Sequence, residues 1–363
     1  MKVLIAPDKF KGSLTAGEVA SAVAAGLADV HPTAAVTTLP VADGGEGTID
    51  AAVAAGFRRV RVPARGPTGL PVTASYAVRG DTAVVELAET SGLHRLPGPP
   101  QPLTATSAGT GDVIAAAVRA GCRRIVLGIG GSACTDGGAG LLTALGARLL
   151  DAAGRELPFG GAALSRLASL DLSALSEVDI ELACDVENPL DEAASVYGPQ
   201  KGASPGDIET LDAALLHWAS IAGPAFADRQ GAGAAGGVGF AAMAVLGARM
   251  RPGIELLLDL LGFDAALTGA SLVITGEGSL DEQTLSGKAP AGVARAAAAA
   301  GIPCVAVSGR CRLSPAELPE AGISAAYALT DLEPDPARCM AEAAPLLRRL
   351  AHRVAIDYFS LSR

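Results

Sequence analysis

The chain has 363 residues, of which half are apolar, 18% are charged and 3% are aromatic, and its formal net charge is −10. This composition can bury a large core, which excludes a disordered chain, and the length predicts two domains. We do not expect a nucleic-acid-binding protein, because an acidic chain with few aromatic side chains can neither neutralise phosphates nor stack on bases.

The first part of the chain repeats one pattern, in which a short apolar strand runs into a glycine- or acid-rich loop and then into a helix. The predicted strand, loop and helix fall at 3–6, 7–13 and 16–28, then at 36–41, 42–47 and 48–55, and then at 125–129, 130–140 and 141–150. Thr15 is a suitable N-cap for the first helix. Strands that alternate with helices predict a parallel sheet of the α/β class.

Other segments follow different patterns. Residues 71–89 alternate around Arg79-Gly80-Asp81 and predict an antiparallel hairpin, whereas 151–220 are rich in loops with helical pieces. Further strands are expected at 272–275 and 304–307, with loops at 276–281 and 308–310. We infer an α/β domain formed from the two ends of the chain, 1–66 plus 270–363, and an inserted α+β domain at 67–269.

The sequence also predicts what the protein lacks. The first apolar segment is too short for a signal peptide, and no segment is apolar enough to span a membrane, so we expect a cytoplasmic protein. The six cysteines contain no CxxC pair and do not cluster with histidine. They are therefore predicted to be free thiols and not zinc ligands.

The loop at 130–140 is the strongest candidate for an anion site, because five of its eleven residues are glycine. Glycines let backbone N–H groups approach a phosphate, and the N-terminus of a following helix favours negative charge. An alternative is a dinucleotide-binding loop, since Gly128, Gly130 and Ala133 fit G-x-G-x-x-A and Asp151 lies about 20 residues further on. The Gly287-Lys288 pair lacks the spacing of a Walker A loop.

Lysines and carboxylates accompany these glycine loops. Four of the five lysines lie in loops marked by glycine or proline, and they are Lys9, Lys11, Lys201 and Lys288. The acidic residues beside glycine or in similar loops are Asp43, Glu46, Asp136, Asp185, Glu277 and Asp281. Cations for phosphates, carboxylates for Mg²⁺ or a hydroxyl proton, and glycine loops together favour phosphoryl transfer. No G-x-S-x-G motif is present, so a serine hydrolase is not expected.

In these motifs and in their order, the sequence resembles the glycerate kinase type-1 family. The matching stretches are APDKFKGSLTA (6–16), VADGGEGT (41–48), TSAGTGD (106–112), GIGGSACTDGGAGLL (128–142), ACDVENPL (183–190), GPQKGAS (198–204), GAAGGVGF (233–240) and TGEGSLDEQTLSGKAP (275–290). The resemblance implies ATP- and Mg²⁺-dependent phosphorylation of D-glycerate at the 2-hydroxyl, with the 3-hydroxyl as the alternative. It also implies a discontinuous Rossmann-like domain, an inserted domain and an active site in the cleft between them, in a monomer or homodimer. Lys9 and Cys134 depart from the residues usual in the family.

We assign roles to the matching residues as hypotheses. Asp43 is the expected general base, with Asp185 as the second candidate, and Lys11 is the third predicted catalytic residue. The predicted substrate-binding residues are Asp8, Lys11, Ser13, Lys201, Asp281 and Lys288. The predicted cofactor-binding residues are Gly130, Gly131, Ser132, Asp136, Gly236 and Gly237, and the predicted Mg²⁺ ligands are Asp136 and Glu277.

Two other classes of function stay open at this point. One is a nicotinamide-dependent oxidoreductase acting on a hydroxy acid, which would bind NAD(H) and not ATP. The other is a non-catalytic anion-binding module, which would bind its ligand without turnover.

Overall fold

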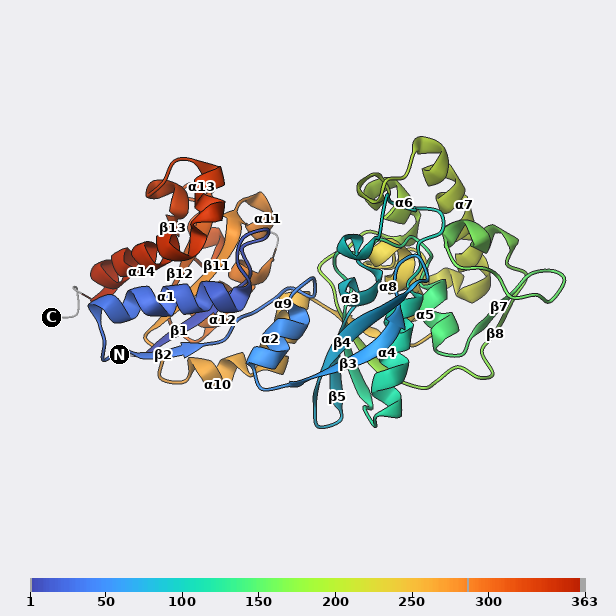
Figure 1. The fold of residues 1–363 in the computed structure, drawn as a ribbon, viewed down its shortest axis with the longest axis horizontal. Coiled ribbons are helices and arrows are strands. Elements are labelled where there is room, and N and C mark those ends of the chain that lie inside the picture. The colour runs from blue at the N-terminus through green and yellow to red at the C-terminus, as the bar shows by residue number, and fades with distance from the viewer. Residues whose placement is uncertain (1, 286, 360–363) are drawn as a thin grey trace. The chain divides into compact units, whose positions relative to one another are not determined.

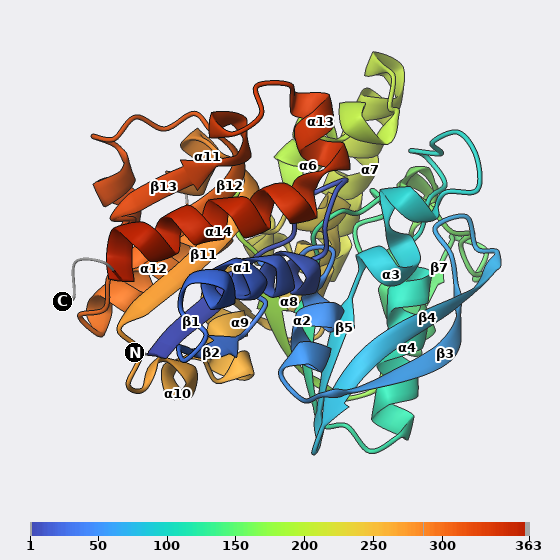
Figure 2. The ribbon, with the colours of Figure 1, turned by 60° about the vertical axis from the view of Figure 1, so that its left-hand side comes forward.

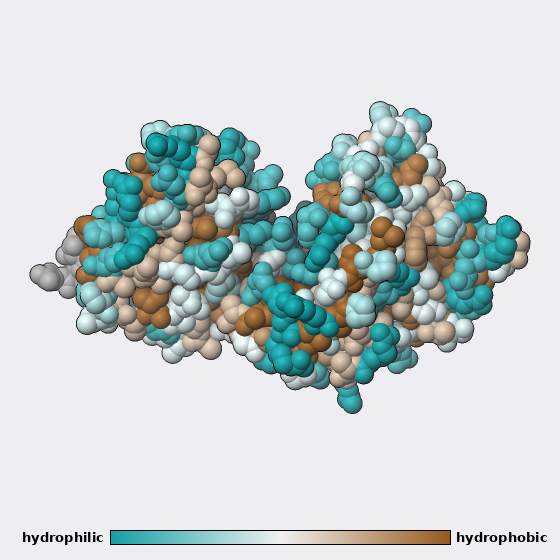
Figure 3. All heavy atoms as spheres, viewed as in Figure 1, coloured by the Kyte–Doolittle hydropathy of each residue, from teal (hydrophilic) through white to brown (hydrophobic). Residues whose placement is uncertain are grey.

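The computed structural model describes residues 2–285 and 287–359, which form a mixed α/β structure (Figure 1). The chain separates into two compact units. Unit 1 comprises Met1–Asp43, Asp50–Gly56 and Ile254–Arg363, and unit 2 comprises Gly44–Ile49 and Phe57–Gly253. None of the described helices is both long and apolar enough to cross a membrane. On the face drawn in Figure 3, apolar residues lie in separate patches among hydrophilic ones.

Unit 1 is built on a sheet of five parallel strands in the order β13-β12-β11-β1-β2. The strands are β1 (Lys2–Pro7), β2 (Ala35–Thr38), β11 (Leu272–Leu280), β12 (Cys304–Cys311) and β13 (Ala325–Ala328). The chain adds β2 on one side of β1 and later adds β12 and β13 on the far side of β11. The direction of winding therefore reverses between β1 and β11, and ligands of open α/β sheets bind at the carboxyl ends of strands at such a point.

Helices cover both faces of this sheet, because right-handed crossovers that run in opposite directions place their helices on opposite sides. α1 (Ala16–Val30) and α14 (Ala343–Phe359) lie side by side (Figure 2) and share a core with β1, β11 and β12. Thr15 caps α1 as predicted, in a capping box with Glu18. The other α-helices assigned wholly or mainly to unit 1 are α2 (Thr48–Ala54), α9 (Gly253–Leu261), α10 (Phe263–Leu267), α11 (Glu282–Leu285), α12 (Ala289–Ala299) and α13 (Pro336–Ala341).

Unit 2 contains a sheet of six strands in the order β10-β9-β6-β5-β4-β3. The strands are β3 (Arg58–Arg65), β4 (Pro71–Arg79), β5 (Thr82–Glu86), β6 (Arg124–Gly128), β9 (Asp179–Ala183) and β10 (Arg249–Arg251). β4 and β5 form the predicted antiparallel hairpin, with Arg79 opposite Thr82, and β5, β6, β9 and β10 are parallel. The carboxyl ends of β5, β6 and β9 therefore meet at one edge of the sheet.

The helices of unit 2 bury a core that includes Trp218 and Phe240, whose rings contact edge to face. These helices are α3 (Ala88–Ser91), α4 (Ala108–Arg119), α5 (Ala139–Ala144), α6 (Ala193–Tyr197), α7 (Pro205–Ala222) and α8 (Ala234–Ala244). The six cysteines are free, as predicted.

The helix predicted at 141–150 is wrong in its second half. α5 ends at Ala144, and Gly146 adopts a positive φ of 107°, a conformation that commonly terminates a helix. The next residues form β7 (Arg148–Leu150), which pairs with β8 (Ser169–Asp171) in a small separate sheet.

The loops predicted at 276–281 and 308–310 are also mostly wrong, because β11 and β12 continue through them. The two segments pair with each other, with Glu277 opposite Ser308 and Ser279 opposite Arg310. Their backbone groups are therefore satisfied by each other, and two chain segments that look like loops separately form a ladder together.

The compact units divide at different residues from the expected boundaries near 66 and 270. β3 pairs along its whole length with β4, so residues 58–65 group with unit 2. Residues 254–269, in α9 and α10, group with unit 1.

Candidate functional site

Carboxylates gather at the switch point of the unit 1 sheet. Asp8 directly follows β1, and its N–H donates to the carbonyl oxygen of Gly276 at 2.8 Å. Glu277, the next residue of β11, therefore lies beside Asp8, at the level of the sheet where β1 ends. The Asp8 side chain is only 11% exposed, and its Oδ1 atom lies 3.9 Å from Lys9 Nζ. The sheet thus places two acidic side chains where an open α/β sheet binds ligands.

Burial and mutual repulsion change how these carboxylates titrate. Burial raises the pKa of Asp8 to about 7; Lys9 opposes this change, and the nearby Asp43 charge adds to it. Burial likewise raises the pKa of Glu277 to about 6, opposed by a hydrogen bond from Thr284 Oγ1 at 2.6 Å. Asp43 also raises the pKa of Glu277, so all three carboxylates interact. A carboxylate with a pKa near 7 suits proton transfer at neutral pH.

Cations and further polar groups surround this carboxylate cluster (Asp8, Asp43 and Glu277). Lys288 is close enough to lower the pKa of Glu277, and its Nζ donates to Gln283 Oε1 at 2.6 Å. Asp281 also acts on Glu277, while its Oδ2 accepts from Ser279 Oγ at 3.1 Å. The structure thus brings Asp281 and Lys288 to the cluster.

The loop between β1 and α1 holds the two other predicted residues of unit 1. Lys11 is exposed, and its backbone passes close to Gly278 of β11. Ser13 does not face the carboxylates, because its hydroxyl donates to the carbonyl of Met340 in α13 at 3.0 Å.

In unit 2, the acidic glycine loop at 44–49 packs on the carboxyl ends of the parallel strands. The carbonyl oxygen of Gly44 accepts from the N–H of Gly130 at 3.2 Å. A Cβ atom on Gly128 would lie 2.4 Å from that same oxygen, and one on Gly44 would lie 2.6 Å from the carbonyl oxygen of Ala183. Three of the matching motifs therefore meet through backbone contacts that admit no side chain.

We expect Gly128→Ala to displace loop 44–49 and to lower the free energy of unfolding by about 1–3 kcal/mol, the usual cost of overpacking. The check is urea unfolding, with Gly206→Ala as the control, since no atom lies within 4 Å of a Cβ at that exposed glycine. Equal stability of the two variants would contradict this packing.

The loop at 130–140 is not the open phosphate cradle that its glycines predict. Protein acceptors already bind the N–H groups of Gly130, Ala133, Gly137, Gly138, Ala139, Gly140 and Leu141. The glycines allow close packing instead, since a Cβ on Gly140 would lie 2.1 Å from Thr106 Oγ1.

Asp136 is a buried acceptor inside this loop and not an exposed metal or nucleotide ligand. One carboxylate oxygen, Oδ2, accepts from the N–H and hydroxyl of Ser107 at 2.8 and 2.9 Å, from Thr106 Oγ1 at 3.2 Å and from the N–H of Gly140 at 3.2 Å. The other oxygen accepts from the N–H of Gly138 at 3.1 Å. The predicted roles of Asp136 in binding Mg²⁺ and cofactor are therefore not supported by its geometry.

Lys201 is likewise not placed to bind a substrate. It is 2% exposed, and its Nζ atom donates to the carbonyl oxygen of Cys134 at 2.6 Å. Burial lowers the pKa of Lys201, while Cys134 and Asp136 oppose that change. The side chain supports the backbone of the loop at 130–140 from inside the unit.

The remaining predicted residues of unit 2 have mainly structural contacts. Asp185 is exposed, and its Oδ1 atom accepts from the N–H of Gly253, the first residue of α9, at 2.7 Å. Gly236 and Gly237 adopt positive φ angles of 68° and 89°, and the Gly236 carbonyl accepts from the N–H of Gly137. Gly131 and Ser132 lie on the loop at 130–140, and their N–H groups are not among those that bind protein acceptors there.

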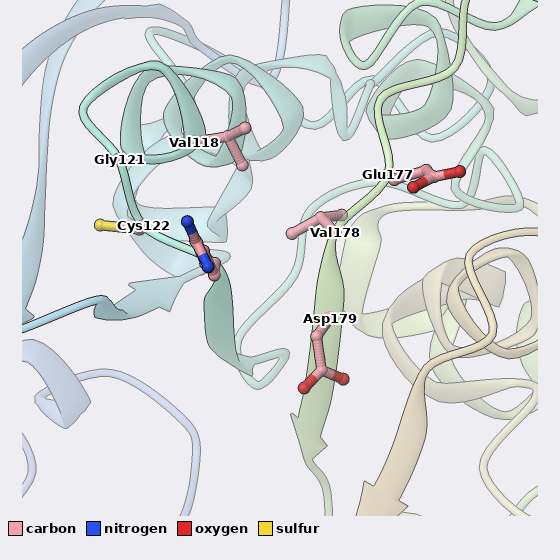
Figure 4. Close-up of a pocket in the computed structure, with 7 residues that line it drawn as sticks. Val118, Gly121, Cys122, Glu177, Val178 and Asp179 are labelled. Carbon is pink, nitrogen blue, oxygen red and sulfur yellow. The ribbon is translucent and has the colours of Figure 1, made fainter.

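A hollow of about 610 Å³ in unit 2 lies away from these motifs (Figure 4). Its lining includes Arg123, which precedes β6, and Asp179, which begins β9. The hollow is therefore at the amino ends of the parallel strands, the opposite end from the one where α/β sheets bind ligands.

Comparisons with known proteins agree with the motifs. A model of the glycerate kinase family matches residues 3–358. The chain is 45% identical to glycerate kinase of Bacillus subtilis (91% of this chain, 90% of the relative) and 46% identical to glycerate 2-kinase of Escherichia coli (85% of each). It also resembles the crystal structure of a proposed glycerate kinase 2 from Salmonella typhimurium, with a TM-score of 0.86 and 43% identity over 99% of this chain and 98% of that one. The chain therefore belongs to the glycerate kinase family.

Proposed function

We propose that this enzyme, a phosphotransferase with an alcohol acceptor, transfers the terminal phosphoryl group of ATP to the 2-hydroxyl of D-glycerate and forms 2-phosphoglycerate. The observation that carries this proposal is the carboxylate cluster at the switch point of the unit 1 sheet. The choice of the 2-hydroxyl rests on the name of the Escherichia coli relative, glycerate 2-kinase.

In the proposed mechanism, Asp43 accepts the proton of the substrate hydroxyl as its oxygen forms a bond to the terminal phosphorus of ATP. The bond from that phosphorus to the bridging oxygen breaks, and ADP leaves with the electron pair. An alcohol is a poor nucleophile at pH 7, so a positioned base is needed. The negative charge of Asp43 adds to the effect of burial in raising the pKa of Asp8.

Lys11 and Lys288 are the cations that we propose for the substrate carboxylate and the ATP phosphates. Both belong to unit 1, where Lys288 already acts on Glu277. Gly131 and Ser132 stay proposed contacts to the nucleotide. Asp185 is the second proposed base.

Mg²⁺ would accompany ATP and neutralise charge on the transferred group. Among residues 2–285 and 287–359, no group of three or more His, Cys, Asp or Glu side chains is arranged to hold a metal ion. Mg²⁺ in kinases needs only one or two carboxylates together with substrate phosphates. Glu277 and Asp8 fit this requirement, because the pairing of β1 with β11 places the two carboxylates beside each other at the switch point of the sheet.

We expect phosphorus NMR to show one new phosphomonoester after incubation with Mg-ATP and D-glycerate. In a proton-coupled spectrum, 2-phosphoglycerate gives a doublet from its single methine proton, whereas 3-phosphoglycerate gives a triplet from its methylene group. A triplet would assign the reaction to the 3-hydroxyl. ATP left intact by folded protein would overturn the proposed function.

A further inference from the structure

Glu86 is a buried carboxylate that the proposed phosphoryl transfer does not use. It is the last residue of β5, it is 5% exposed, and it lies opposite Gly128 in the parallel pairing of β5 with β6. A charge is costly to bury unless it is hydrogen-bonded. The hydrogen bonds that Glu86 accepts therefore indicate the role of this buried charge.

Those contacts are with the acidic glycine loop at 44–49. The Oε2 atom of Glu86 accepts from the N–H of Gly47 and from the N–H of Ile49, each at 3.2 Å, and Oε1 accepts from Gly47 at 3.3 Å. These N–H groups stand at the start of α2, where a helix leaves its N–H groups without intrahelical acceptors. Glu86 supplies the missing acceptor from another strand, and hydrogen bonds to a charged acceptor are the stronger kind.

The same loop is held at its other end by backbone packing. Gly44 has no side chain that would hinder this packing, and its carbonyl oxygen accepts from the N–H of Gly130. Thr48 closes the loop internally, with its hydroxyl donating to the carbonyl of Gly45 at 2.6 Å. The loop is thus fixed at both ends, and Asp43 is the residue that directly precedes it.

We propose that Glu86 is a positioning residue for Asp43: by binding Gly47 and Ile49 it fixes the loop that begins one residue after the base. This inference rests on the proposed function. Misplacing a catalytic group by about 1 Å can cost about 100-fold in rate, so a distant contact of this kind can control turnover.

The test compares Glu86→Ala with Glu86→Gln. The Gln carbonyl can occupy the place of Oε2 and keep both N–H bonds, whereas Ala removes them. The matched control is Glu181→Gln, a glutamate of the same unit that is 8% exposed and is held by Arg124 and Arg249. We expect kcat to fall about 100-fold in Glu86→Ala with the KM for ATP unchanged, and to stay within a few-fold of the parent in the two Gln variants.

Amide hydrogen exchange of residues 44–53 gives a readout that does not depend on the reaction. Exchange at Gly47 and Ile49 should become at least about tenfold faster in Glu86→Ala only, while near-ultraviolet circular dichroism shows that the fold persists. Unchanged exchange would overturn the contact, and faster exchange with parent-like kcat would overturn the positioning role. If the parent protein forms no phosphoglycerate, the proposed function fails, and the exchange data still decide whether Glu86 holds the loop.

Discussion

Replacing Asp43 with Asn should lower kcat about 1,000-fold while leaving the KM for ATP nearly unchanged. The substitution keeps the size of the side chain but removes the carboxylate that we propose as proton acceptor, and general bases contribute about 10²–10⁴-fold. The measurement is steady-state release of ADP at saturating D-glycerate. A kcat within a few-fold of the parent would remove Asp43 from the base role.

Two further variants make this result specific. Asp264→Asn changes an exposed carboxylate of unit 1 and should leave kcat unchanged. Asp185→Asn tests the second candidate and should leave stability nearly unchanged, because the Asn side-chain oxygen can also accept from the first N–H of α9. A large loss of kcat in Asp185→Asn but not in Asp43→Asn would transfer the base role to Asp185.

Local sequence patterns predicted much of the fold. Thr15 followed by Glu18 is a capping box, and the structure has that cap; Arg79-Gly80-Asp81 predicts a turn, and β4 and β5 flank it. In both examples the interactions lie within a few residues of each other. The extension of β11 past Gly276 could not be predicted in this way, because its partner, β12, lies about 30 residues away and also reads as a loop.

Of the candidate site, the sequence predicted the residues that follow apolar strands but not the packing of the glycine loop. The apolar runs before Asp8 and Glu277 are enough to predict that each residue follows the buried part of a strand, and the structure brings both to the switch point. The loop at 130–140 is different, since glycine serves close packing and anion binding equally well. The sequence also does not reveal that Lys201 is buried on the carbonyl of Cys134. Glu86 was missed, although an acidic residue that ends an apolar strand was an available signal.

The second large effect concerns Asp8, which we expect to stabilise the protein when it is replaced by Asn. The pKa of Asp8 is about 7 in the folded chain, against an ordinary value of 3.8. The folded state is therefore most stable while Asp8 is protonated in it: this stability is fully present below about pH 4 and is lost as the pH rises through about 7. At pH 8 the buried charge therefore costs on the order of 4 kcal/mol, and Asn, which keeps an oxygen for the N–H of Lys9, removes that charge.

Thermal unfolding should thus show a Tm that is several degrees higher for Asp8→Asn at pH 8 and nearly equal at pH 4. Asp29→Asn is the control with the opposite sign, because the hydrogen bonds from Arg348 lower the pKa of that exposed carboxylate. The same Asp8→Asn variant should lose activity and the rise of kcat/KM for D-glycerate through about pH 7. If Asp8 is retained for its chemistry, the Asp8→Asn variant should gain stability and lose activity. A lower Tm of this variant at pH 8 would instead mean that the ion pair of Asp8 with Lys9 outweighs the cost of burying the charge.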